Sequence, residues 1–150
     1  MAIILKEGDK APAFFATNEN GKKISLADYK GKKLILYFYP KDATPGCTAE
    51  ACDLRDNYHS FIAQGYEILG VSPDKGSAHI KFIAKYNLPF SLLADEDHSV
   101  SEAYGVWGEK SMYGRKYMGI LRTTFVINEK GKIEKIIEKV DTKKHSTQLL

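Results

Sequence analysis

The residues of this chain with the clearest capacity for chemistry are its two cysteines, Cys47 and Cys52, five positions apart. We expect a cytoplasmic chain, because no targeting segment is recognisable, and cytoplasmic thiols are kept reduced. A structural disulfide is therefore not expected, which leaves core packing, a metal site or redox chemistry. A metal site is the weakest of these, because no second pair of ligands accompanies Cys-x-x-x-x-Cys, and we expect no metal and no cofactor.

Cys47 lies where a helix is predicted to begin. Thr44 is a suitable N-cap, and Pro45 then falls at the first helical position, where its missing N–H is not needed. The unpaired N–H groups and positive dipole end of a first helical turn favour a thiolate. Lowering a thiol pKa from about 8.5 to about 6 raises the thiolate fraction at pH 7 only about thirtyfold. A fast reaction therefore also needs transition-state donors, for which the candidates are the N–H groups of Gly46 and Cys47, the Thr44 hydroxyl and a guanidinium.

The neighbouring elements are predicted to place this thiol at the edge of a sheet. Leu34–Tyr39 is apolar at every position and is stopped by Pro40, which predicts a central strand buried on both faces. The following helix is predicted to end at Gly65, with one apolar stripe formed by Cys47, Ala51, Leu54, Tyr58 and Phe61. Cys47 would then lie beyond the carboxyl end of the strand, where ligands bind in α/β sheets.

The rest of the chain alternates strands and helices. Asn20-Gly21 predicts a two-residue turn in an N-terminal β-hairpin, since both positions would take positive φ. A helix from Ser77 is predicted to turn Ile80, Ile83 and Ala84 inward. Further strands are predicted at Glu67–Ser72, Ser91–Ala94, Thr123–Ile127 and Ile133–Glu138, a further helix at Ser99–Tyr104, and an irregular segment at Gly105–Ile120. The pattern indicates one α/β domain over residues 1–150, a central mixed β-sheet flanked by helices.

The run from Tyr37 to Cys52 contains the spacing Pro-x-x-x-Thr-x-x-Cys, present as Pro40, Thr44 and Cys47. This specific signature resembles that of peroxiredoxins of the bacterioferritin comigratory protein (PrxQ) group. The stretches 70–74, 104–108 and 122–125 are similar to the same group, so the resemblance spans nearly the whole chain. It implies a thioredoxin-like fold and the reduction of hydrogen peroxide and organic hydroperoxides, with thioredoxin or a similar reductant as partner.

The resemblance also implies roles for single residues. Cys47 would be the peroxidatic cysteine and Cys52 the resolving one, joined during turnover by an intramolecular disulfide. Thr44 and Arg122 would orient and polarise the peroxide, and Pro40 would shield the pocket. The expected substrate-binding residues are therefore Pro40, Thr44, Gly46 and Arg122. The alternative is a thiol–disulfide oxidoreductase or redox-regulated binding module on the same fold, but disulfide exchange needs neither Thr44 nor Arg122 and more naturally uses Cys-x-x-Cys.

Other polar residues are interpreted as structural or left open. The segment Asp95–His98 is typical of a solvated turn that caps the next helix, more than of a metal site. Trp107 is interpreted as packing. Glu50 either belongs to the site network or simply favours the helix N-terminus. The sequence indicates no partner for three histidines, His59, His79 and His145.

Composition argues against several other classes of protein. The 22 basic and 19 acidic side chains are interleaved and give a formal charge of +3, so no nucleic-acid partner is expected. No stretch approaches the roughly 20 apolar residues of a membrane span, and the apolar run Ala2–Leu5 is too short for a signal peptide. By the resemblance we also expect a monomer.

One geometric consequence follows if both cysteines lie in a single helix. Their Cα atoms would be about 8.6 Å apart, given five rises of about 1.5 Å and a rotation of about 140°. A disulfide needs less than about 7 Å. We therefore expect the first turn or two of this helix to unwind before Cys47 and Cys52 can join.

Overall fold

The computed structural model describes residues 4–150, so the start of the apolar run Ala2–Leu5 lies outside the described residues. The strands are β1 (Phe15–Asn18), β2 (Lys23–Ser25), β3 (Lys33–Phe38), β4 (Tyr66–Ser72), β5 (Ser91–Ala94), β6 (Trp107–Met112), β7 (Arg115–Ile120), β8 (Thr123–Ile127) and β9 (Ile133–Ile137). The helices are the 3-10 helix η1 (Leu26–Tyr29), α1 (Pro45–Asp56), α2 (Tyr58–Ala63), α3 (Gly76–Tyr86), α4 (Ser99–Ala103) and α5 (His145–Leu149). Within residues 4–150, no helix is long and apolar enough to cross a membrane.

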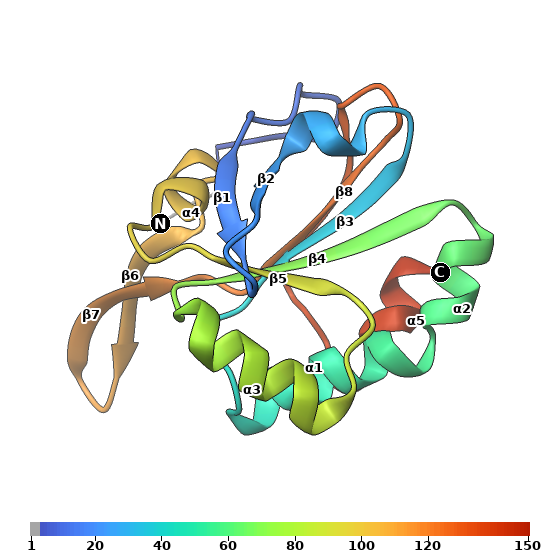
Figure 1. Cartoon of the computed structure of the whole chain (residues 1–150). Coiled ribbons are helices and arrows are strands. Elements are labelled where there is room, and N and C mark those ends of the chain that lie inside the picture. The colour runs from blue at the N-terminus through green and yellow to red at the C-terminus, as the bar shows by residue number, and fades with distance from the viewer. Residues whose placement is uncertain (1–3) are drawn as a thin grey trace.

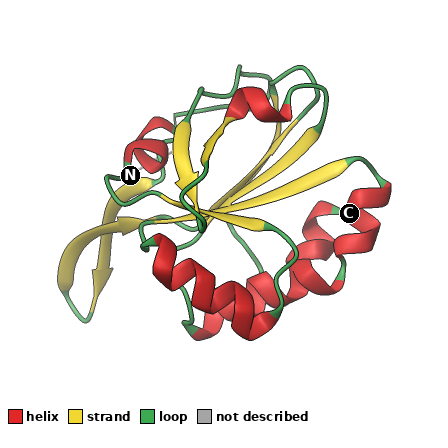
Figure 2. Cartoon of the chain, in the orientation of Figure 1, coloured by secondary structure: helices red, strands yellow, loops and turns green. Residues whose placement is uncertain are grey.

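All strands except β6 and β7 form one mixed sheet in the order β2-β1-β5-β4-β3-β8-β9 (Figure 1). β3 and β5 lie parallel to β4 on its two sides, whereas β8 is antiparallel to β3. Helices α1, α2, α3 and α5 pack against one face of this sheet, where they gather in Figure 2, and α4 packs against the other. The predicted central mixed sheet, flanked by helices and preceded by a β-hairpin, is confirmed.

The central strand β3 is buried on both faces, as predicted. Leu34, Leu36 and Phe38 contribute to one core cluster, while Ile35 and Tyr37 contribute to the cluster beneath α1. Gly70 of β4 lies opposite Tyr37, and a Cβ there would lie 2.8 Å from the Tyr37 Cζ and 2.6 Å from the Leu92 Cδ2. Only glycine therefore leaves room for the Tyr37 ring.

Two local predictions need correction. Only Gly21 of the Asn20-Gly21 pair has positive φ, and the turn is longer because the Asn18 carboxamide accepts hydrogen bonds from the N–H groups of Asn20 and Lys22. The long helix predicted to reach Gly65 is broken at Asn57. There the side-chain amide donates to the Asp53 carbonyl, the acceptor that a continuing helix would offer to the Asn57 N–H.

The predicted inward face of α3 is correct for Ile83, which packs against the core, but wrong for Ile80 and Ala84, which are exposed. The helix buries His79 and Phe82, whereas Ile80 is 48% exposed. His79 faces inward because each ring nitrogen finds a polar partner there, Asp42 and the Leu93 carbonyl. A polar interaction between distant segments thus overrides the apolar periodicity of the helix.

The segment Gly105–Ile120 is not irregular but forms the β6–β7 hairpin, which projects from the main sheet (Figure 1). Its two turn residues, Tyr113 and Gly114, both have positive φ, as a two-residue hairpin turn requires. Residues 111–118 are all exposed. The hairpin therefore lacks the alternation of apolar and polar residues that indicates a half-buried strand.

Candidate active site

Cys47 lies in the first turn of α1, as predicted, with Pro45 at the start of the helix and the thiol 1% exposed. Thr44, the residue before Pro45, has an extended backbone with φ −80° and ψ 155°, but its hydroxyl does not cap the helix. It donates instead to the Lys41 carbonyl at 2.8 Å. The predicted position of Thr44 at the N-cap is therefore correct, whereas the predicted capping hydrogen bond is wrong.

Arg122 reaches the thiol from the neighbouring strand. β8 pairs antiparallel with β3 so that Thr123 faces Phe38, and this places Arg122 at the carboxyl end of β3. Its Nη2 donates to the Cys47 Sγ at 3.2 Å. A Cβ on Gly46 would lie 3.3 Å from the same Nη2, so the missing side chain leaves room for the guanidinium.

Glu50 holds the other side of the guanidinium. Its Oε1 accepts from the Arg122 Nη1 at 2.7 Å, and the carboxylate is fully buried. Burial raises the pKa of Glu50 to about 7, although the charge of Arg122 acts in the opposite direction. The pKa of Arg122 is itself raised, because Glu50 and Cys47 outweigh the effect of burial. Of the two interpretations left open for Glu50, this geometry favours membership of the site network.

Two further buried groups lie beside Glu50, and the sequence analysis missed both. His145 of α5 lies with Nε2 2.8 Å from the Thr124 Oγ1 and 3.6 Å from the Glu50 Oε2. Burial lowers the pKa of His145, so the ring is neutral near pH 7. The second group is the hydroxyl of Tyr37. Among the buried side-chain atoms of the described residues, only this hydroxyl and the Glu50 Oε2 have no hydrogen-bond partner. Alternation along β3 could have placed Tyr37 on the face of α1, but no local signal marks His145.

Cys52 lies in the same helix as Cys47, and both thiols are free. Cys47 is buried and Cys52 is half-buried. The next residue, Asp53, anchors α1 to α5: the Ser146 N–H donates to its carboxylate at 2.6 Å, and Asn57 donates to the Ser146 hydroxyl at 2.9 Å. The intact helix keeps the two sulfurs apart, since an ideal helix separates their Cα atoms by about 8.6 Å.

The chain is similar to known proteins over nearly its whole length. The AhpC/TSA family matches residues 7–136. Peroxiredoxin Bcp of Bacillus subtilis is 49% identical over 148 residues, which cover 99% of this chain and 94% of that protein. Peroxiredoxin Bcp of Escherichia coli K12 is 45% identical over 146 residues, covering 97% of this chain and 94% of its own length. The chain belongs to the AhpC/TSA family and is a peroxiredoxin of the Bcp group.

A solved structure agrees with this membership. The bacterioferritin comigratory protein of Xanthomonas campestris, studied for alkyl peroxide reduction, matches with a TM-score of 0.87 and 33% identity. The match covers 99% of this chain and 94% of that one. The thioredoxin-like fold expected from the sequence is therefore confirmed, and as a peroxiredoxin the chain is a thiol peroxidase that consumes peroxides and a thiol reductant.

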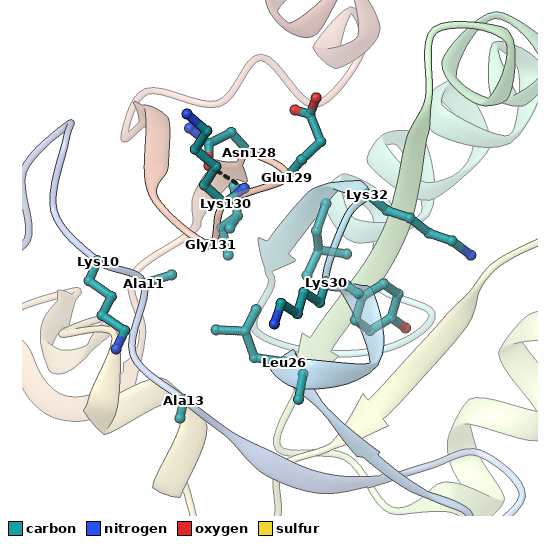
Figure 3. A pocket seen from close by; sticks show the side chains of 14 residues that line it. Lys10, Ala11, Ala13, Leu26, Lys30, Lys32, Asn128, Glu129, Lys130 and Gly131 are labelled. Atoms are coloured by element: carbon teal, nitrogen blue, oxygen red, sulfur yellow. Dashed lines mark hydrogen bonds between the residues drawn. The ribbon is translucent and has the colours of Figure 1, made fainter.

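The peroxiredoxin also has a cavity of about 480 Å³, whose lining residues are shown in Figure 3. Its lining includes Leu34, at the start of β3, and Ile127, at the end of β8, whereas Cys47 lies beyond the opposite ends of both strands. Exposed lysines at its rim include Lys10, Lys30 and Lys130. This cavity is therefore separate from the site around Cys47. Pro40, at the start of the loop that leads to Cys47, is half-buried.

The acidic turn Asp95–His98 caps α4, as predicted. Asp95 accepts hydrogen bonds from the N–H groups of Val100 and Ser101 at 3.0 and 2.9 Å. Its carboxylate is buried rather than solvated, which corrects the expected environment. Trp107 packs as predicted, with its ring stacked 3.7 Å from that of His98.

Proposed function

We propose that Cys47 attacks hydrogen peroxide and organic hydroperoxides and that Cys52 resolves the product. The observation that supports this most strongly is the 3.2 Å contact between the Arg122 Nη2 and the Cys47 Sγ. Glu50 fixes the same guanidinium through Nη1, so Arg122 has a defined orientation toward the sulfur. A planar, permanently charged donor held at a thiol stabilises negative charge as it moves from sulfur to oxygen.

In the first step the Cys47 thiolate attacks one peroxide oxygen. The S–O bond forms as the O–O bond breaks, so sulfur is oxidised to sulfenic acid and the leaving oxygen departs as water or an alcohol after taking a proton. Arg122 and the N–H groups of Gly46 and Cys47 would stabilise the leaving oxygen. The Thr44 hydroxyl donates its hydrogen bond to the Lys41 carbonyl, so its lone pairs are available to accept a hydrogen bond from the O–H of the bound peroxide. Pro40 would shield the pocket from water.

In the second step the Cys52 thiol condenses with the sulfenic acid, which forms the disulfide and releases water. A thioredoxin-type dithiol then reduces the disulfide and restores both thiols. Because α1 holds the cysteines apart, its first turns must unwind before condensation. Peroxide binding and disulfide formation therefore use different conformations of α1.

The substrate range and setting are also proposed. The alkyl peroxide reduction studied in the Xanthomonas campestris relative supports organic hydroperoxides as substrates of this chain. We place the enzyme in the cytoplasm, acting as a monomer and as one domain over residues 1–150. No metal or cofactor takes part in the proposed cycle, because the two thiols supply the two electrons that reduce the peroxide.

The test of the nucleophile is Cys47→Ser. A serine hydroxyl is not appreciably ionised near neutral pH, so peroxide turnover with thioredoxin and its reductase should disappear. Thermal unfolding of the variant should match that of the unmodified protein, since one atom changes. Residual turnover above a few per cent in the folded variant would place the chemistry elsewhere.

A further inference from the structure

A buried polar cluster lies beneath the segment 40–44, which joins β3 to α1. This segment carries Pro40 and Thr44 and sets the point from which the first turn of α1 begins. It includes Ala43 with φ 64°, a left-handed conformation that a Cβ disfavours. The segment therefore needs tertiary contacts to keep this shape.

Those contacts converge on Asp42. Its Oδ1 accepts from the Tyr39 hydroxyl at 2.6 Å, and its Oδ2 lies 2.6 Å from the His79 Nδ1. Its N–H donates to the Asp74 Oδ2 at 2.8 Å. Among the described residues, the hydrogen bonds that tie residues 41–44 to the sheet or to α3 all involve Asp42.

His79 is the charged partner in this cluster. The ring is completely buried, and Nε2 lies 2.8 Å from the Leu93 carbonyl, which can only accept, so Nε2 carries a proton. Nδ1 lies 2.6 Å from the Asp42 Oδ2, and below the folded pKa of the ring it donates the second proton to this carboxylate. Burial alone would lower the pKa of His79, but the hydrogen bond and charge of Asp42 raise it overall, with smaller contributions from Leu93 and Asp74.

The cluster does not have the form of a metal site. Asp42, Asp74 and His79 bring their ligand atoms within 4.8 Å of one another. These atoms already serve one another or their neighbours as hydrogen-bond partners, since Asp74 also accepts from the Ser72 hydroxyl at 2.7 Å. A buried ion pair of this kind costs desolvation that an apolar pair would avoid, so it is weak support for stability alone.

We propose that His79 is a positioning residue for peroxide reduction, whose buried ion pair with Asp42 fixes the segment that presents Thr44 and Cys47 to the peroxide. The proposal rests on the proposed function of Cys47. His79 touches neither the thiol nor the substrate and acts through Asp42, which lies midway between Pro40 and Thr44. A displacement of about 1 Å in a reacting group can cost about a hundredfold in rate, so an anchor here bears directly on catalysis.

The ion pair should make the rate of the reaction with peroxide depend on pH. His79 is charged below its raised folded pKa, and the anchor is then complete. Above that pKa the proton on Nδ1 is lost, and a lone pair faces the Asp42 carboxylate. Reactivity toward peroxide should therefore fall as the pH rises through the folded pKa of His79.

The experiment compares two reactions of Cys47 in the reduced protein. Hydrogen peroxide needs the oriented site, whereas alkylation by iodoacetamide needs mainly an accessible thiolate. In His79→Gln, the side chain cannot carry a charge or serve both partners. We expect its peroxide rate constant to fall at least about tenfold, its alkylation rate to change less than about threefold, and its decline with rising pH to disappear. The matched control is His59→Gln on the exposed surface of α2, which should change neither rate.

Asp42→Asn provides a second test of the same ion pair. It should produce the same selective loss, and the double variant should react no more slowly than the slower single variant, because both remove one interaction. Unchanged peroxide rates in the folded variants, or equal losses in both reactions, would overturn the proposal. If neither variant folds, the pH profile of the unmodified protein decides, since the absence of a decline with rising pH contradicts the role of His79. An unmodified protein that does not react with peroxide at Cys47 would instead refute the proposed function.

Discussion

The guanidinium of Arg122 contacts both the thiol of Cys47 and the carboxylate of Glu50. Arg122→Lys keeps a positive charge but loses the planar fork that serves two partners at once. We expect the rate constant for peroxide to fall at least about tenfold, or about 1.4 kcal/mol in activation free energy. Stopped-flow measurement of Cys47 oxidation checks this, with Arg115→Lys on the exposed β6–β7 hairpin as control. An Arg122 variant as fast as the control would remove this residue from the site.

Glu50 should also make the free energy of unfolding depend on pH. Its pKa rises from 4.5 to about 7 on folding, so between those values the folded chain keeps a proton that the unfolded chain has lost. Raising the pH through this window therefore favours unfolding, by up to about 1.4 kcal/mol per pH unit from this group. Glu50→Gln cannot ionise and should lose this contribution.

Urea unfolding at pH 5, 6 and 7 tests the expectation for Glu50. The free energy of unfolding of Glu50→Gln, relative to that of the unmodified protein, should increase steadily with pH. Glu102→Gln on the exposed surface of α4 serves as the control and should show no such trend. A constant difference across the three pH values would mean that Glu50 is ionised throughout, as a strong ion pair with Arg122 would require.

At the scale of elements, the proposed cycle requires α1 to be rigid while peroxide binds and to unwind when the disulfide forms. In the reduced protein its first turn holds Cys47, and Asp53 anchors its last turn to Ser146 of α5. Disulfide formation must unwind the segment between the cysteines, because an intact helix keeps their Cα atoms beyond about 7 Å. Unwinding also destroys the donors around Cys47, so the oxidised form should not bind peroxide.

Hydrogen exchange tests this motion. Amides across Gly46–Asp56 should exchange faster in the oxidised than in the reduced protein, and so should those of α5 if its anchor at Asp53 is released. The central strands β3 and β8 should change little, since they form the interior of the sheet. Identical exchange in the two redox states, or a disulfide formed with α1 intact, would contradict the unwinding.

For the molecule as a whole, sequence reasoning succeeded where structure follows from local signals. The all-apolar run of β3 and the Thr44-Pro45 helix start were visible in the sequence, and the signature around Cys47 pointed to the family. The roles of His79 and His145 were not visible, because their partners Asp42 and Thr124 lie 37 and 21 residues away. The β6–β7 hairpin was missed because strands exposed on both sides show no apolar period.

The proposed cycle assigns different tasks to the two cysteines. The most direct measurement is therefore peroxide consumption by Cys52→Ser, followed over time with thioredoxin and its reductase present. We predict one rapid turnover per chain, which leaves Cys47 as sulfenic acid, and then a stall, because no disulfide forms for the reductant to attack. Undiminished steady-state turnover, or no initial turnover in the folded variant, would contradict the division of roles between Cys47 and Cys52.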